Sequence, residues 1–266
     1  MTTQNLTMTK AFEELTVPVG NRRVLVQSRG DLPIATAPSL WLTTRFPQTL
    51  GFGSGLSVSS WVDKSANGFD GSQITAAKQP TYTLDAINGR PALYFDGGDH
   101  LALDNSQLHS NKAGKGLTVF AVIKTDVGGS GYFFGKFNTD QQEFFCYANT
   151  GGNNSQFCIC EALNSATTAD WATTIEWENA SIFTGWWQPN ENHRIYYNGL
   201  LKSTNEDVPV QSISSGTEHL RVGAISGGLG NQLEGYIGEI IAFPAGLSDA
   251  DLYAMVQYLM YEWRIA

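Results

Sequence analysis

Short apolar runs, each about the length of a strand, follow one another along the chain from Ser39 to Phe243. They are rich in β-branched and aromatic residues, and turns containing glycine, asparagine or proline separate them. This pattern predicts a series of β-strands joined by tight turns. The strands that we expect are Leu40–Leu42, Leu56–Val62, Thr81–Leu84, Ala92–Phe95, Leu101–Leu103, Leu117–Lys124, Tyr132–Phe137, Glu143–Tyr147, Gln156–Glu161, Ser181–Gln188, His193–Tyr197, Leu200–Lys202, Leu220–Ala224 and Tyr236–Phe243.

Two of these segments carry additional information. The run Leu117–Lys124 is almost continuously apolar and β-branched, so we expect it at the centre of a sheet. The dipeptide Asn198-Gly199 separates two of the expected strands. It predicts a two-residue hairpin turn, because both central positions of that turn need a positive φ.

One helix is predicted at the end of the chain. Ser248, with Asp251 three residues later, is typical of a helix start, since the serine hydroxyl can accept the amide hydrogen at that spacing. The next apolar residues have helical spacing and form one stripe, which we expect to lie across the sheets. They are Leu252, Met255, Val256, Leu259 and Trp263.

The first 38 residues differ in character from the rest of the chain. They carry four basic and three acidic residues, a net charge of +1, which leaves −10 for the remainder of a chain whose total is −9. Pro18 and Gly20 interrupt any helix, and only Val24–Val26 predicts a strand. We therefore expect an N-terminal docking arm and linker at 1–38 and one domain at 39–266. The candidate assembly residues of the arm are Phe12, Leu15, Val17, Arg22 and Arg23.

Three segments together resemble the laminin-G-like, or concanavalin A-like, jelly roll. They are the turn Trp61–Gly68, the strand and glycine turn from Asn88 to Gly97, and the closing strand Gly235–Ile241. The resemblance runs from about Leu40 to Trp263. It implies an all-β fold: a two-sheet antiparallel jelly-roll sandwich with an extended N-terminal arm and one C-terminal helix.

Domains that are similar in this way occur in virion proteins of tailed bacteriophages and in bacterial surface proteins. The resemblance, the arm and the absence of a signal-peptide pattern at Met1–Thr7 favour a non-enzymatic virion structural protein, made in the host cytoplasm. In this interpretation the arm binds other virion proteins. The jelly roll is then a capsid decoration or a tail or fibre module that adheres to host glycans, and a homo-oligomer is compatible with such an arm. The alternative is a carbohydrate-binding module of a bacterial surface protein.

Charge, hydropathy and cysteine count exclude several other classes. A net charge of −9 opposes binding to nucleic acid. The apolar run Leu117–Ile123 is far shorter than a membrane span, so we expect no membrane partner. The three cysteines are an odd number, which argues against a disulfide framework. We expect Cys146, Cys158 and Cys160 to be small buried residues, with a Cys146–Cys158 bond as the alternative.

Catalysis is the third functional class. Glycosidases of this fold carry two or three carboxylates on alternate residues of one strand. Glu176 and Glu178 have that spacing, but Ala180 stands at the next position. A solvated edge is the better interpretation, and we expect no catalytic residue. A glycoside hydrolase or polysaccharide lyase therefore ranks below both binding functions.

Aromatic residues provide the strongest candidate for sugar binding. Trp171 and Trp177 lie among polar residues, near the asparagine-rich loop 149–155. An exposed indole can stack on the C–H face of a sugar while amides bond its hydroxyls. The predicted carbohydrate site is therefore Trp171, Trp177, Asn153 and Asn154. Of the adjacent pair Trp186 and Trp187, we expect one ring in the core and the other facing outward.

Metal binding has weaker support. The segment Asp63–Gly68 resembles the first half of a calcium loop, but Ile74 stands where the bidentate glutamate is needed. Asp63 is expected instead to accept backbone N–H groups in its own turn. Asp96 and Asp99 remain the only candidate Ca²⁺ ligands, and no other cofactor is expected.

Overall fold

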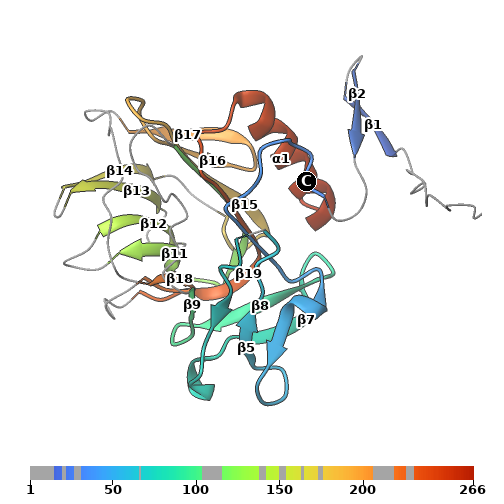
Figure 1. Ribbon diagram of the computed structural model, residues 1–266, viewed down its shortest axis with the longest axis vertical. Helices are drawn as coiled ribbons and strands as arrows, with labels where there is room; N and C mark the ends of the chain where they lie inside the picture. The colour runs from blue at the N-terminus through green and yellow to red at the C-terminus, as the bar shows by residue number, and fades with distance from the viewer. Residues whose placement is uncertain are drawn as a thin grey trace, which may run out of the picture.

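The computed structural model describes residues 15–19, 22–26, 31–65, 67–103, 116–137, 142–149, 154–162, 165–172, 176–205, 219–225 and 231–266. Within these ranges two antiparallel sheets pack face to face as a sandwich, and a single α-helix covers the outer face of one sheet (Figure 1). The chain therefore has the all-β, two-sheet architecture with one C-terminal helix that its pattern predicted.

The first sheet has eight strands in the described part of the chain, and the helix covers it. In spatial order it contains β17 (Leu200–Thr204), β16 (Arg194–Tyr197), β15 (Ser181–Trp187), β10 (Leu117–Thr125), β19 (Glu234–Phe243), β8 (Arg90–Asp96) and β7 (Thr81–Ile87), with β3 (Leu40–Thr43) also paired to β19.

The second sheet has nine described strands. In spatial order they are β14 (Ser165–Ala172), β13 (Asn154–Ala162), β12 (Gln142–Asn149), β11 (Ser130–Phe137), β18 (Leu220–Val222), β9 (Leu101–Leu103), β6 (Gly71–Ser72), β5 (Val58–Trp61) and β4 (Leu50–Phe52). Two short 3₁₀ turns, η1 (Pro47–Thr49) and η2 (Ala76–Lys78), belong to the connections. The edge strand β14 was not expected, because its alanine- and threonine-rich sequence lacks the apolar alternation of the others.

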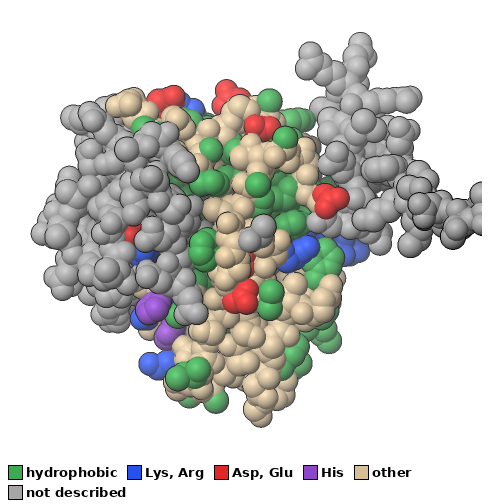
Figure 2. Space-filling view, in the orientation of Figure 1, with side chains coloured by type: hydrophobic (Ala, Val, Ile, Leu, Met, Phe, Trp, Pro, Cys, Tyr) green, Lys and Arg blue, Asp and Glu red, His purple; other side chains and the backbone are tan. Residues whose placement is uncertain are grey.

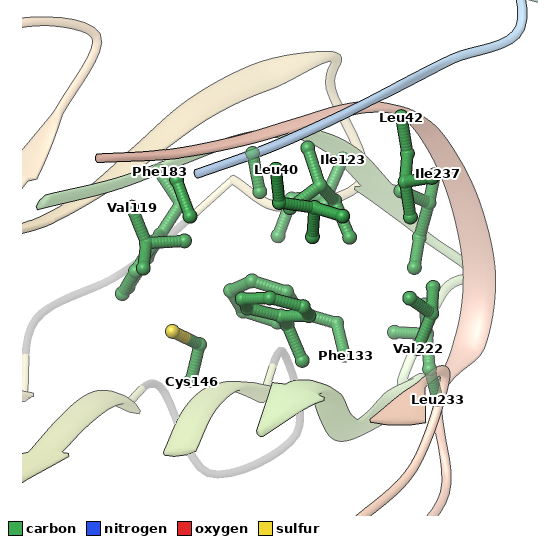
Figure 3. Close-up of a cluster of buried hydrophobic side chains, with 14 of the residues drawn as sticks. Leu40, Leu42, Val119, Ile123, Phe133, Cys146, Phe183, Val222, Leu233 and Ile237 are labelled. Carbon is green, nitrogen blue, oxygen red and sulfur yellow. The ribbon is translucent and has the colours of Figure 1, made fainter. Parts of the chain in front are cut away.

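The main core lies between the two sheets. Side chains of the eight-stranded sheet, such as Val119 and Phe183, meet Phe133 and Val222 of the nine-stranded sheet (Figure 3). All four are fully buried. This interdigitation of two inner faces is the usual way in which a sandwich removes apolar surface from water.

β10 is the central strand that its composition predicted, with β15 on one side and β19 on the other. Val119 and Ala121 point into the main core, whereas Phe120 and Val122 join a second core beneath the helix. A strand that is buried on both faces has no polar alternation. This explains the continuous apolar run in the sequence.

Helix α1 (Asp249–Trp263) confirms the predicted start and stripe. Ser248 is its N-cap and accepts a hydrogen bond from the Asp251 backbone N–H at 3.2 Å. The five stripe residues named above are all buried in the second core. Arg264, with φ of 53°, ends the helix in the left-handed region.

The N-terminal region forms a hairpin of β1 (Leu15–Val19) and β2 (Arg22–Val26) in place of the single predicted strand. The arm candidates Leu15 and Val17 lie in β1 and Arg22 and Arg23 in β2, while Phe12 lies outside the described residues. This two-stranded sheet has no strand pairing with either sheet of the sandwich in the described ranges.

The expected linker 1–38 contains residues that pack on the domain. Leu32 is buried in the second core, and Ile34 packs against it. The packed domain therefore reaches back at least to Leu32, inside the range that we expected to be arm and linker.

The three cysteines lie on both sides of the nine-stranded sheet. Cys146 lies in the main core, whereas Cys158 and Cys160 belong to a third apolar cluster on the other side of the nine-stranded sheet; all three are buried free thiols, as expected. Cys146 therefore does not pair with Cys158.

In the part of the chain that the structure describes, no helix has the length and apolarity to cross a bilayer.

Candidate ligand-binding groove

A groove of about 550 Å³ lies between α1 and the β15–β16–β17 end of the eight-stranded sheet. At the top of Figure 2, over these elements, hydrophobic side chains are interspersed with acidic ones. This volume is within the range of small-ligand sites. The residues that line it are Thr184, Arg194, Tyr196, Asn198, Gly199, Leu200, Leu201, Asp249, Leu252, Tyr253, Val256 and Gln257.

The Asn198-Gly199 turn joins β16 to β17 and forms the end of the hairpin wall that faces α1. Both residues have positive φ, 47° and 78°, which is the turn that the dipeptide predicted. Asn198 is tied to β15, since its Oδ1 accepts the Ile182 N–H at 2.8 Å and its own N–H donates to the Ile182 carbonyl at 2.9 Å. A Cβ at Gly199 would lie 2.9 Å from Val256 Cγ1. Glycine therefore lets the hairpin approach α1 closely.

The walls expose apolar and aromatic surface to solvent. Leu200 is 64%, Leu201 54% and Tyr253 48% exposed, although each lines a concave surface. Such residues in a groove provide contact area for a ligand that is partly apolar. Tyr253 also has a polar hydroxyl at the end of its apolar ring.

Polar groups stand beside this apolar surface. From the helix, Asp249 and Gln257 line the groove one turn on either side of Tyr253, because residues four apart share a helix face. From β16, Arg194 stacks its guanidinium 4.2 Å from the centre of the Trp186 ring and donates from Nη2 to Glu191 Oε2 at 3.2 Å. These two contacts hold the guanidinium plane in one orientation.

Thr184 lies at the floor of the groove. Its side chain is 1% exposed, and its hydroxyl has no hydrogen-bond partner within the described part of the chain. Thr184 pairs directly with Tyr196 across β15 and β16, so both side chains are on the groove face of the sheet. A buried hydroxyl without a partner is destabilising. A ligand hydroxyl or a water could supply the missing bond.

A buried polar cluster holds α1 in position as one wall of the groove. Glu239 of β19 is 1% exposed and accepts hydrogen bonds at 2.6 Å from the indole N–H groups of both Trp41 and Trp263. Arg45 donates to the two oxygens of Glu239 at 3.2 Å each, and to Glu262 at 2.6 Å. The cluster therefore joins β3 and β19 to the C-terminal end of the helix.

The protonation of Arg45 follows from this cluster. Burial alone would lower the pKa of Arg45, but the carboxylates of Glu239 and Glu262 outweigh burial and raise that pKa overall. Arg45 also donates to the Tyr258 hydroxyl. The guanidinium stays charged and links the sheet to the helix.

The predicted carbohydrate site is only partly assembled. Trp171 in β14 pairs with Ser155, and Asn154 pairs with Ala172, so the backbone brings Trp171 and Asn154 to neighbouring positions. Asn153 and the side chains of these two residues lie outside the described part of the chain.

The expectation that Trp177 is exposed is wrong. Its side chain is fully buried, with its ring 5.1 Å from that of Tyr197 and 6.3 Å from that of Phe183. Its neighbours Glu176 and Glu178 are exposed, as expected for a solvated edge. Trp177 lies in a turn, closed by the Asn179 N–H that donates to the Glu176 carbonyl at 2.9 Å. The turn directs the ring into the core while its charged neighbours face solvent, so charged neighbours do not imply an exposed ring.

The expectation that one ring of the pair Trp186 and Trp187 faces outward is also wrong, because both rings are buried. Trp187 lies in the main core. Trp186 points away from that core, but the second core covers it, and its indole donates to the Leu247 carbonyl at 2.8 Å. The helix and the segment before it therefore cover the face that we expected to be open.

The acidic turns are used structurally. Asp63 is buried and accepts backbone N–H groups from Trp41, Ser65 and Phe69 at 2.8–3.0 Å, as expected for its turn. Of the two candidate Ca²⁺ ligands, Asp96 accepts the Gly98 N–H at 2.8 Å and Asp99 accepts the Asp96 N–H at 3.3 Å.

The pKa of Asp99 bears on the same turn. Burial, together with the neighbouring Asp96, raises the pKa of Asp99 to about 6. No three His, Cys, Asp or Glu side chains in the described ranges come together as a metal cage.

The groove was not among the sites predicted from the sequence. Asp249, Tyr253 and Gln257 recur at every fourth residue and lie outside the apolar stripe of the helix. The pair Leu200-Leu201 comes directly after a hairpin turn at the end of a sheet. Both groups of residues can be read from the sequence, but only the packing of α1 against β16 and β17 brings them to one surface.

No protein-family model matches the chain, and no curated protein matches it either. Among solved structures, the chain is similar to domain 4 of AbnA, a GH43 extracellular arabinanase from Geobacillus stearothermophilus, in complex with arabinotriose. The identity is 12% and the TM-score 0.57, and the match covers 84% of this chain and 99% of that domain.

Two further binding domains are similar over about half of their own length. The binding domain of Paraclostridial Mosquitocidal Protein 1 has 10% identity and a TM-score of 0.57, with 84% of this chain and 52% of that chain covered. The ligand-binding domain of botulinum neurotoxin serotype D, in complex with N-acetylneuraminic acid, has 13% identity and a TM-score of 0.52, with 84% and 51% covered. This chain thus spans about half the length of these two binding domains. At such identities the likeness establishes the β-sandwich fold.

Proposed function

We propose that this chain is a non-enzymatic, lectin-like protein that binds a carbohydrate in the groove between α1 and the β16–β17 hairpin. The observation that carries the proposal is the groove surface itself, where Tyr253 and two leucines are exposed beside Arg194 and Asp249. Sugars have apolar C–H faces and polar hydroxyl rims. A surface that combines rings with charged and amide groups matches both.

Two further observations support binding over turnover. Asp249 is the one carboxylate among the described lining residues, whereas hydrolysis of a glycosidic bond requires a pair. The fold is shared with domains solved in complex with arabinotriose and with N-acetylneuraminic acid. These are the first soluble probes to use, beside a glycan array.

The test replaces one exposed tyrosine of the helix and compares it with another. Tyr253→Ala should weaken binding of the best array glycan about tenfold, because a stacking surface is lost. Tyr261→Ala is the matched control: Tyr261 is 50% exposed on the same helix but does not line the groove. Calorimetric titration measures both. Absence of binding on the array, or equal losses for the two variants, would contradict the proposal.

We infer further that the N-terminal arm docks the protein on a virion, with the sandwich as a capsid decoration or a tail or fibre module. The hairpin β1–β2 supports this role, since it pairs only with itself in the described ranges. An isolated two-stranded hairpin is marginally stable in water, so a docking partner would stabilise it. A carbohydrate-binding module of a bacterial surface protein is the alternative, and it would use the same groove.

Deletion of residues 2–30 tests the arm. The deletion should abolish incorporation into particles, measured by co-sedimentation with purified virions, and leave glycan binding unchanged. Normal incorporation of the truncated protein would refute the docking role. If the truncated protein also lost glycan binding, the ligand site would not be the groove between α1 and the hairpin alone.

A further inference from the structure

Three basic side chains converge near the junction of β9 and β18, on an otherwise acidic protein. Lys78 ends η2, His100 precedes β9, and Arg221 lies in β18. Arg221 pairs with Ala102, two residues after His100, so the side chains of His100 and Arg221 are diagonal neighbours on one face of the sheet. Figure 2 shows histidine and Lys or Arg side chains gathered at the lower left.

Gln73 determines which nitrogen of His100 carries the proton. The Gln73 Oε1 accepts the Thr75 N–H at 3.0 Å, so its amide NH₂ is the group that faces His100. That NH₂ lies 3.0 Å from His100 Nε2 and 3.2 Å from the His100 carbonyl. Nε2 therefore accepts, and the hydrogen of the neutral imidazole is on Nδ1.

Two N–H donors of this cluster have no acceptor. His100 Nδ1 and Arg221 Nε are both buried atoms without a hydrogen-bond partner among the residues that the structure describes. Buried donors are normally paired, and each unpaired one is destabilising. Two unpaired donors on diagonal neighbours indicate a missing acceptor rather than a packing defect.

The charges around His100 indicate the sign of that acceptor. Burial, followed by the charges of Arg221 and Lys78, lowers the pKa of His100 to about 4. Gln73, which faces the Nε2 side of the ring, is neutral, so within the described residues both charged groups that shift the pKa of His100 are cationic. A negatively charged acceptor would relieve this repulsion and pair both donors.

We propose that Lys78, His100 and Arg221 form a binding site for a sulfate or phosphate oxyanion, separate from the groove at α1. The Nδ1–H of His100 and the Nε–H of Arg221 each donate to one oxygen of the anion. Lys78, which is exposed at the rim, adds a mobile positive charge. The source of the oxyanion is either the free ion or a sulfated or phosphorylated sugar.

NMR titration of the His100 imidazole tests the site on the full chain. Sodium sulfate should raise the pKa of His100 and shift its Nδ1 resonance, whereas sodium chloride at equal ionic strength should do neither beyond general screening. Arg221→Gln and Lys78→Gln should each weaken the sulfate affinity, Arg221→Gln about tenfold. Lys78 is exposed, so its replacement keeps the fold. Arg194→Gln, which removes an arginine from the groove, is the control and should leave the sulfate response intact.

A second titration distinguishes the two sources. The site is assigned to a sulfated sugar if galactose 6-sulfate binds more tightly than inorganic sulfate. Galactose without sulfate should then cause no change in the His100 resonances. Equal affinities of the two sulfates assign it to the free ion. An identical response to sulfate and chloride, or a sulfate response that survives in both Arg221→Gln and Lys78→Gln, overturns the proposal. Either result is independent of Tyr253 and the groove.

Discussion

At the scale of single residues, Thr184 carries a buried polar atom that lines the proposed ligand groove. Its hydroxyl is buried without a partner in the described ranges. Thr118, on the adjacent strand β10, is equally buried, but its hydroxyl donates to the Ala245 carbonyl at 2.7 Å and accepts the Leu247 N–H at 3.1 Å. The two threonines differ in whether their polar atom is paired.

This difference predicts opposite effects of the same substitution. Thr184→Val should raise the free energy of unfolding by about 1 kcal/mol, because it removes an unpaired buried hydroxyl and keeps the side-chain shape. The same change should weaken glycan binding in the groove. Thr118→Val should lower the free energy of unfolding by about 1 kcal/mol, since it breaks two hydrogen bonds. Urea denaturation measures both; destabilisation by Thr184→Val would mean that its hydroxyl is paired after all.

At the scale of elements, the position of α1 depends on polar as well as apolar contacts. The stripe beginning with Leu252 supplies the buried area, but a stripe alone allows a helix to slide along a sheet. Glu239 restricts this freedom because it bonds Trp263 of the helix and Trp41 of β3 at the same time. The groove between α1 and the hairpin has a defined width only if the helix stays in this place.

Glu239→Gln therefore has a structural and a functional consequence. Loss of the buried charge leaves Arg45 without its two-oxygen partner, which should lower the free energy of unfolding by about 3 kcal/mol. Glycan affinity should fall with it, because α1 forms one wall of the groove. Glu178→Gln, at an exposed position, should change neither property. A Glu239→Gln protein as stable as the parent would show that the apolar stripe alone holds the helix.

At the scale of the whole molecule, the chain combines a sandwich of high negative charge with a short N-terminal hairpin. Among the residues whose burial is described, the cores include Leu32 near the start of the chain and Ile265 near its end. The hairpin has no strand pairing with either sheet of the sandwich in the described ranges. We therefore expect the protein lacking residues 2–30 to keep the thermal unfolding midpoint of the full chain, measured by circular dichroism. A large drop in that midpoint would show that the arm is part of the folded domain.

Much of the architecture could be predicted from the order of residues, because strands, turns and helix caps obey local rules. The continuous apolar run of β10, the Asn198-Gly199 turn and the Ser248 cap each follow from backbone geometry within a few residues. β14 was not predicted, because its own residues have only a weak preference for strands. Its pairing with β13, a contact between segments, makes it a strand.

The sites were decided by contacts that no local pattern records. The charged neighbours of Trp177 predict an exposed ring, yet it is buried against Phe183 and Tyr197. The groove unites a helix face with a hairpin far earlier in the chain, and the basic cluster unites η2, β9 and β18. Taken alone, the order of residues determined the elements and the class of fold, since these depend on hydrogen bonds and burial over short stretches. Tertiary packing decided which side chains face solvent together, because that depends on which elements cover one another.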